Sequence, residues 1–206
     1  MATDVQNSTA APVADPWKDA VFELIPRQGM WSEEEYLVLT GHSNRLVEFT
    51  DGFLEILPMP TEKHQSILFF LCVAFHNFIE PRGGKVSFAG LRLRIRDGKL
   101  REPDILLVRS TADPRRNNKI WDGADLVLEV ISDDNPERDV KDKRGEYAEA
   151  RIPEYWIVNP LNETITVLRL MGTAYEEAGN YRRGQSATSV LLPEFSVDVA
   201  ATFDAD

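Results

Sequence analysis

The sequence predicts a mixed α/β fold in which helices flank one β-sheet and the C-terminal part is rich in strands. Stretches with helical periodicity alternate along the chain with stretches of strand-like alternation. The 206 residues are 43% hydrophobic, which is enough for a core of ordinary size without covalent cross-links. The single cysteine, Cys72, excludes an intramolecular disulfide and suits a reducing compartment.

Domain organisation is simple. Residues 1–16 are small, polar and contain prolines, so we expect a disordered tail followed by a single domain over residues 17–206. No N-terminal stretch pairs a basic region with an apolar run, and the longest apolar run, Ile67–Phe75, is too short to span a bilayer. We therefore expect a cytoplasmic protein without membrane contact.

The first half of the chain begins with a helix and a hairpin. Ser32 and Glu35 form the sequence pattern of a capping box, which predicts a short helix that ends at Gly41. Residues 46–57 form two apolar runs around Asp51-Gly52, a pair that favours the tight turn of a β-hairpin.

Thr61 can cap a helix that runs to about Ile79 and is apolar on nearly every face, so we expect this helix to be buried. A strand over residues 86–95 and a return strand over residues 100–108 follow, with a turn at Asp97-Gly98, and then a polar loop over 110–123.

The second half predicts a strand over Asp125–Ser132 and a helix from Pro136 to about Arg151. Strands over residues 155–158 and 164–170 come next, and a β-rich hairpin region ends the chain.

Glu129 is the first candidate site residue. In its strand, Leu126, Leu128 and Val130 point to one side, and Asp125, Val127, Glu129 and Ile131 point to the other. A carboxylate between Val127 and Ile131 on a buried face is costly unless it is paired or binds a metal. A plain alternative is that Glu129 lies at a strand end and bonds to the backbone or to an arginine.

Asp104 is the second candidate. Pro103 limits strand pairing, so Asp104 is expected at the start or at a bend of its strand. Pro-Asp is also ordinary turn chemistry. If the loop between the two strands brings Asp104 and Glu129 to one side of the sheet, the pair makes a site of hard oxygen ligands suited to Mg²⁺ or Mn²⁺.

Lys143 is the third candidate, because it lies on the helix face between Val140 and Tyr147, both expected to be buried. A lysine that faces inward needs a carboxylate or a substrate. The alternatives are a side chain that extends to the surface or an ion pair with Asp139 one turn away.

Glu48, in the first hairpin, and His64, in the first turn of the long helix, are weaker candidates. A lone strand acid is more often exposed, and a lone histidine on an apolar face is usually a core residue; the functional alternative for His64 is contact with a substrate phosphate.

Several motifs occur together. They are Val47-Glu48-Phe-Thr-Asp51-Gly52, Met59-Pro60 with His64, Glu102-Pro-Asp104-Ile-Leu-Leu-Val, Asp125-Leu-Val-Leu-Glu129-Val-Ile-Ser132, Asp139 with Lys143 and Tyr147, Ile152-Pro-Glu-Tyr-Trp-Ile-Val-Asn-Pro160, Tyr181, and Leu192-Pro-Glu-Phe195. Together they resemble the Uma family of restriction endonucleases, in the PD-(D/E)XK nuclease superfamily, over nearly the whole expected domain.

The resemblance implies a restriction-endonuclease-like fold, with Asp104, Glu129 and the peptide carbonyl of Val130 as ligands of Mg²⁺ or Mn²⁺. The superfamily's usual lysine, two residues after the glutamate, is replaced here by Ile131. The inward-facing Lys143 is the candidate for its role. Asn159 stands where the family commonly has aspartate. On this reading Glu48 would help to hold a second ion, and His64 would position a phosphate.

The expected function is therefore metal-dependent hydrolysis of phosphodiester bonds in DNA. The formal net charge of −11 weighs against tight DNA binding, because proteins that bind phosphates usually carry surplus lysine and arginine. The charge and Ile131 favour the alternative of an inactive nuclease-fold module that binds protein or nucleic acid. Another phosphoester is a third possible substrate. A homodimer would let symmetric copies cut both strands.

Overall fold

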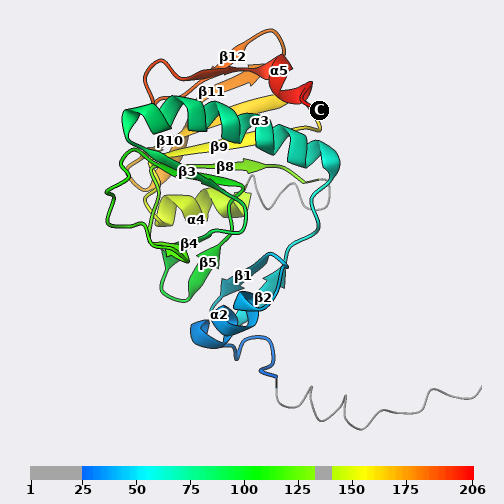
Figure 1. Cartoon of the computed structure of the whole chain (residues 1–206), viewed down its shortest axis with the longest axis vertical. Helices are drawn as coiled ribbons and strands as arrows, with labels where there is room; N and C mark the ends of the chain where they lie inside the picture. Colours follow the sequence, from blue (N-terminus) through cyan, green and yellow to red (C-terminus); the bar gives the residue numbers. More distant parts are fainter. Residues whose placement is uncertain (1–24, 133–140) are drawn as a thin grey trace, which may run out of the picture.

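The computed structural model describes residues 25–132 and 141–206, and these form two principal β-sheets with helices beside and between them (Figure 1). The six-stranded sheet, in the order β11-β10-β9-β8-β6-β3, contains β3 (Lys85–Phe88), β6 (Ile105–Val108), β8 (Leu126–Val130), β9 (Glu154–Asn159), β10 (Thr164–Met171) and β11 (Ala174–Arg182). The five-stranded sheet, in the order β2-β1-β5-β4-β7, contains β1 (Val47–Thr50), β2 (Phe53–Ile56), β4 (Arg92–Arg96), β5 (Lys99–Arg101) and β7 (Ile120–Trp121). The mixed α/β class is confirmed, but the prediction of one sheet is wrong.

The remaining elements are α2 (Glu33–Gly41), α3 (Glu62–Ile79), the 3₁₀ turn η1 (Glu80–Arg82), α4 (Lys143–Glu149), α5 (Val199–Phe203) and the pair β12 (Ser186–Thr188) and β13 (Ser196–Asp198). The short α5 was not predicted, and neither was β7 within the polar loop. The predicted disordered tail and the start of the predicted helix at Pro136 lie outside the described residues. In the part of the chain that the structure describes, no helix has both the length and the hydrophobicity needed to cross a membrane.

Local sequence signals explain where the first elements begin. Ser32 and Glu35 form the predicted capping box at the start of α2. The turn between β1 and β2 has positive φ at both central residues, 48° at Asp51 and 86° at Gly52, which a two-residue hairpin requires. A Cβ atom on Gly52 would also lie 2.6 Å from the backbone of Gly29. The predicted hairpin is therefore confirmed, and Gly52 is required both by its positive φ and by the close approach of Gly29.

The long helix α3 is capped as predicted, since the Thr61 side chain accepts a hydrogen bond from the His64 backbone N–H. Its buried face packs against the six-stranded sheet, whereas Phe69 and Val73 are exposed. The prediction that α3 is buried on nearly every face is therefore wrong. The reason is its position, because α3 covers the outside of the sheet (Figure 1).

Two predicted strands are each divided between the sheets. Residues 86–95 become β3 and β4, which pair with β6 and β5 respectively, and Gly90 lies at the crossing with φ 94°. Residues 100–108 become β5 and β6, and the chain passes back to the larger sheet at Glu102–Asp104 around Pro103. The chain thus crosses between sheets at Asp104.

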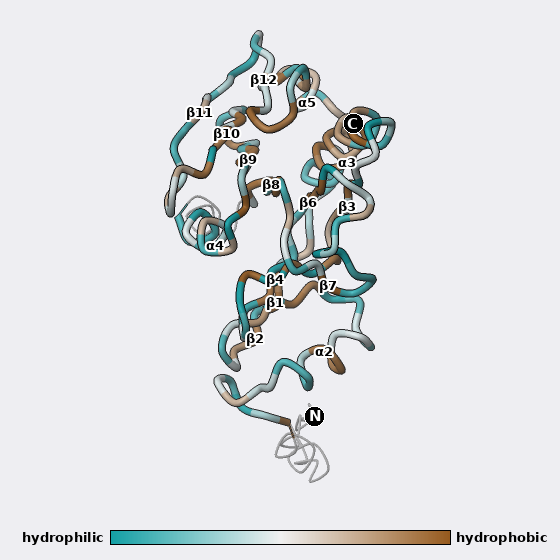
Figure 2. The backbone as a smooth tube through the Cα atoms, turned by 90° about the vertical axis from the view of Figure 1, so that its left-hand side faces the viewer, coloured by the Kyte–Doolittle hydropathy of each residue, from teal (hydrophilic) through white to brown (hydrophobic). Residues whose placement is uncertain are grey.

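Two apolar cores lie on the two faces of the six-stranded sheet. One joins α3 and α5 to Leu126, Leu128 and Val130 of β8, and the other joins α4 and β4 to Val127 and Ile131. The alternation predicted for β8 is confirmed. In Figure 2, α3 and α4 lie on opposite sides of β8 and β9. Because Glu129 shares a face with Val127, its side chain points into the layer that contains α4.

Candidate metal centre

Asp104 directly precedes β6, and Glu129 lies in the neighbouring strand β8. β6 and β8 are antiparallel and their pairing ends with Ile105 opposite Leu128, so Asp104 and Glu129 each come one residue after that last pair. The Asp104 Oδ2 atom accepts a hydrogen bond of 2.8 Å from the Val130 backbone N–H. The two acids that the sequence singled out therefore converge at one end of this strand pair.

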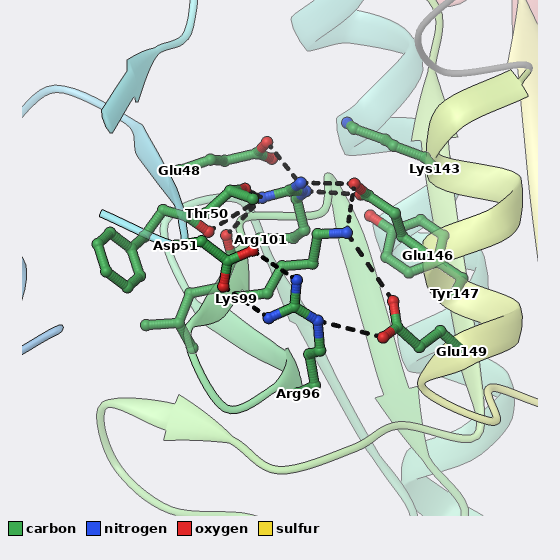
Figure 3. Close-up of polar contacts among 12 residues, drawn as sticks. Glu48, Thr50, Asp51, Arg96, Lys99, Arg101, Lys143, Glu146, Tyr147 and Glu149 are labelled. Carbon is green, nitrogen blue, oxygen red and sulfur yellow. Dashed lines mark hydrogen bonds and ion pairs between the residues drawn. The ribbon is translucent and has the colours of Figure 1, made fainter. Parts of the chain in front are cut away.

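Glu129 is held by two side chains from α4. The Lys143 Nζ atom lies 2.9 Å from Glu129 Oε1, and the Tyr147 hydroxyl donates a hydrogen bond to the same oxygen. The side chains of Lys143 and Glu129 are only 6% and 3% exposed. The predicted inward direction of Lys143 is confirmed, and Figure 3 shows Lys143 and Tyr147 on the same helix. Val140 and the alternative partner Asp139 lie outside the described residues.

Tyr147 is a site residue that the sequence analysis placed on a buried face without giving it a role. Its burial and the nearby charge of Glu129 raise its pKa well above the ordinary value of 10.0. The hydroxyl therefore stays protonated and donates to the carboxylate. The signal that could have identified it is its position four residues after an inward-facing lysine, which places both groups on one helix face.

His64 contacts Asp104, since its Nε2 atom lies 3.2 Å from Asp104 Oδ2. Burial disfavours the charged ring, but the hydrogen bond to Asp104 and the charges of Asp104 and Glu129 raise the pKa of His64 above its ordinary value. Its Nδ1 atom is buried and has no hydrogen-bond partner among the described residues. The ring is thus oriented by Asp104, and its predicted contact with a phosphate stays a prediction.

A pocket of about 340 Å³ brings these groups together. Asp104, Glu129, Lys143, His64 and Val130 all contribute to its lining. A further part of the lining comes from the segment between β2 and α3, which contributes Leu57, Pro58, Met59, Pro60 and Thr61. All the predicted site residues except Glu48 therefore meet at one pocket.

Glu48 lies in a buried ionic network and not in the pocket lining. Its Oε2 atom is 3.4 Å from Arg101 Nε, and its Oε1 atom accepts a hydrogen bond of 3.3 Å from the Glu102 backbone N–H. The expectation that Glu48 is exposed is wrong, because its side chain is completely buried. Its expected part in holding a second ion or a metal-bound water stays a prediction.

The network continues from Arg101 to α4. Arg101 makes two hydrogen bonds to Glu146, of 2.6 and 2.5 Å, and Lys99 Nζ lies 3.1 Å from the same carboxylate (Figure 3). Glu102 lines the pocket from the other side of Arg101, and burial raises its pKa to about 7. Ion pairs thus tie the five-stranded sheet to the helix that carries Lys143.

Comparison with known proteins decides the family. The model of the Uma2 family, described as "Putative restriction endonuclease", matches residues 33–200. The chain belongs to the Uma2 family. A solved structure described as "a putative nuclease belonging to DUF820 from Anabaena variabilis ATCC 29413" matches with a TM-score of 0.70, over 86% of this chain and 98% of that chain, at 19% identity. The restriction-endonuclease-like fold is therefore confirmed. A comparison with curated proteins found no significant match.

The donor atoms of this Uma2 chain fit a hard divalent cation. Both hydrogen bonds that the Asp104 side chain makes to described residues use Oδ2. The N–H and C=O of one strand residue point to the same side, so the Val130 carbonyl faces the strand edge where Asp104 lies. Within the described ranges, no group of three or more His, Cys, Asp and Glu side chains is arranged to hold a metal. Two carboxylates and a carbonyl suit Mg²⁺ better than Zn²⁺. Mg²⁺ prefers oxygen ligands, keeps several of its waters and completes its coordination with the phosphate of a substrate.

Proposed function

We propose that this protein is a metal-dependent endonuclease that hydrolyses phosphodiester bonds in DNA. The observation that carries the proposal is the convergence of Asp104, Glu129 and Lys143 in the lining of one pocket, with the Lys143 amine 2.9 Å from the Glu129 carboxylate. Membership in a family described as restriction endonucleases supports nuclease chemistry. The ion would be Mg²⁺ or Mn²⁺, held by Asp104, Glu129 and the Val130 carbonyl.

In the reaction, the oxygen of a water bonds to phosphorus as the water gives up a proton to the solvent, the P–O bond to the leaving sugar oxygen breaks, and that oxygen takes up a proton from the solvent. A bound Mg²⁺ would lower the pKa of the water and stabilise charge on the phosphate. The Lys143 ammonium would orient the water or offset charge on the phosphate oxygens. Tyr147 and His64 would hold Glu129 and Asp104 in place through the bonds already described.

The test is cleavage of supercoiled plasmid and of branched DNA with Mg²⁺ or Mn²⁺. We expect cutting by the wild type, none with EDTA, and a loss of at least a hundredfold in Asp104→Asn. Asp97→Asn is the matched control, because Asp97 is exposed and lies outside the pocket. Cutting that persists in EDTA, or that Asp104→Asn leaves unchanged, would contradict the proposal.

The second candidate is a nuclease-fold module that binds nucleic acid or protein without cutting. The net charge of −11 favours it, because tight DNA binding normally requires surplus positive charge. Binding of labelled DNA without Mg²⁺- or Mn²⁺-dependent cleavage would select this function. A panel of RNA and nucleotide substrates would detect hydrolysis of another phosphoester.

A further inference from the structure

The candidate site is deep and small. The Glu129 and Lys143 side chains are almost fully buried, and the Asp104 side chain is 14% exposed. A pocket of about 340 Å³ lies at the lower end of the size range of small-molecule sites, roughly 300–1,000 Å³. Such a pocket has room for about one nucleotide. A stiff duplex, whose major groove alone is about 12 Å wide, cannot enter it.

One wall of the pocket is apolar and partly exposed to solvent. Leu57, Pro58, Met59 and Pro60 form this wall, and Met59 is 84% exposed. Proline has no N–H to offer to a phosphate, and its ring restricts the backbone, so Met59 is presented between two stiff neighbours. Methionine and proline are residue types that proteins insert between base steps to separate them. This wall suits the face of a base or sugar, whereas Lys143, and a divalent cation held by Asp104 and Glu129, would suit a phosphate.

The charges around the pocket also disfavour a duplex. Among the described residues, four carboxylates line it, from Glu55, Glu102, Asp104 and Glu129, against two lysines, Lys63 and Lys143. Lys63 is directed to the C-terminal end of the chain, where it donates hydrogen bonds to the carbonyls of Phe203 and Ala205. Binding a duplex through its backbone typically uses about 6–10 phosphate contacts. This pocket can neutralise far fewer phosphates, which is sufficient for one nucleotide.

We propose that the pocket receives a single unpaired nucleotide, so that the substrate is a single-stranded or displaced segment of nucleic acid and not an intact duplex. The inference rests on the proposed nuclease function. The phosphate reaches Asp104, Glu129 and Lys143, and the base packs on the wall formed by residues 57–60. Met59 is a specificity-determining residue on this account, because its apolar side chain packs on the face of a base that has left its neighbours.

The test compares two probes by fluorescence anisotropy with Ca²⁺ present: a fluorescein-labelled 12-nucleotide single strand and a blunt hairpin duplex of the same sequence. We expect the single strand to bind at least tenfold more tightly. Met59→Ser should weaken single-strand binding about tenfold and leave duplex binding unchanged. Met171→Ser is the control, since Met171 is also exposed but lies outside the pocket. Both substitutions are at exposed positions, so both variants should fold.

A 2-aminopurine base in the strand gives an independent signal. Its fluorescence should rise on binding to the wild type, because the base leaves its neighbours, and should rise less in Met59→Ser. Equal or tighter duplex binding, or equal effects of the two methionine variants, would overturn the inference. If Asp104-dependent cutting prefers intact duplex, the inference fails and the nuclease function stands. If Met59-dependent single-strand binding occurs but no DNA is cut, the pocket assignment stands and the nuclease function fails.

Discussion

Glu129 illustrates how a buried charge is accommodated at the scale of single residues. Its carboxylate lies between the apolar side chains of Val127 and Ile131, yet one of its oxygens receives both the Lys143 ammonium and the Tyr147 hydroxyl. Taking a charge from water costs several kcal/mol unless close partners replace the lost hydration. The two partners from α4 explain how β8 can place an acid on a buried face.

The ion pair between Lys143 and Glu129 leads to the first prediction. Lys143→Met should lower the free energy of unfolding by about 3–5 kcal/mol, because it leaves a buried carboxylate without its cation. The double variant Lys143→Met with Glu129→Gln should be less destabilised than the sum of the two single variants. Urea unfolding of the wild type, the two single variants and the double variant gives the coupling free energy between the two side chains. Additive losses would show that the pair is not coupled.

The Tyr147 hydroxyl leads to the second prediction. Tyr147→Phe should cost about 1.5–3 kcal/mol of stability, because a buried hydrogen bond to a charged group is lost. Tyr181→Phe removes a hydroxyl that bonds Thr188 at an exposed site, so it should change stability by about 0.5 kcal/mol or less. Thermal or urea unfolding compares them. Similar losses in both variants would refute a special role for the bond to Glu129.

The sequence singled out the two acids, Lys143 and His64, but it gave no role to Tyr147 or to the ionic network around Arg101. Glu129 and Lys143 break an apolar pattern within their own elements, and such a break is visible in the sequence. The bonds from Arg101 to Glu48 and Glu146 join residues 45 or more positions apart, in strands and a helix that meet only in the folded chain. Arginine on a strand and glutamate on a helix look like ordinary surface residues until the second sheet is placed against α4.

At the scale of elements, α4 is fixed on two sides. Lys143 and Tyr147 bind β8 of the larger sheet, and Glu146 and Glu149 bind Lys99, Arg101 and Arg96 of β5 and β4 (Figure 3). This seven-residue helix is too short to be stable alone, so these contacts determine where it lies. They therefore also determine where the Lys143 amine lies relative to Glu129.

The ion pairs between α4 and the smaller sheet should stabilise the fold less in acid. Although burial opposes it, the hydrogen bonds and charges of Arg101 and Lys99 lower the pKa of Glu146 below its ordinary value of 4.5. Its contribution to stability is therefore fully present above that value and is lost as the pH falls through the lower folded pKa. Glu146→Gln should be destabilised at about pH 7, and its difference from the wild type should shrink toward about pH 3. A difference that stays constant across this range in urea titrations would argue against the pairing.

Strand prediction succeeded where the signal was local and failed where sheet membership mattered. The Asp51-Gly52 turn and the Thr61 cap are fixed by their own neighbours, and both were predicted. The alternation over residues 86–95 continues through Gly90, yet its two halves join different sheets. Periodicity reports which face of a strand is buried, and it contains no information about which sheet the strand joins. The neighbouring positions of Asp104 and Glu129 at the ends of β6 and β8 could, for the same reason, not be predicted from the pattern.

For the molecule as a whole, the net charge of −11 means that DNA and protein repel each other. Divalent cations in the pocket would offset that repulsion locally, where the phosphate must approach. We predict that anisotropy will show binding of single-stranded DNA with millimolar Ca²⁺ and a loss of at least tenfold in affinity with EDTA. Adding NaCl to the same ionic strength should not restore the lost affinity. Restoration by NaCl would mean that general screening, and not a bound ion, permits binding.

The most direct test of the central claim is the anomalous scattering of Mn²⁺ in crystals soaked with the ion. We predict one strong peak within about 2.0–2.6 Å of a carboxylate oxygen of Asp104 and of Glu129, the range of oxygen–metal bonds. The peak should be absent from crystals of Asp104→Asn and present in those of Asp97→Asn. A wild-type crystal with no peak between the two carboxylates, or a peak that Asp104→Asn leaves in place, would contradict the account.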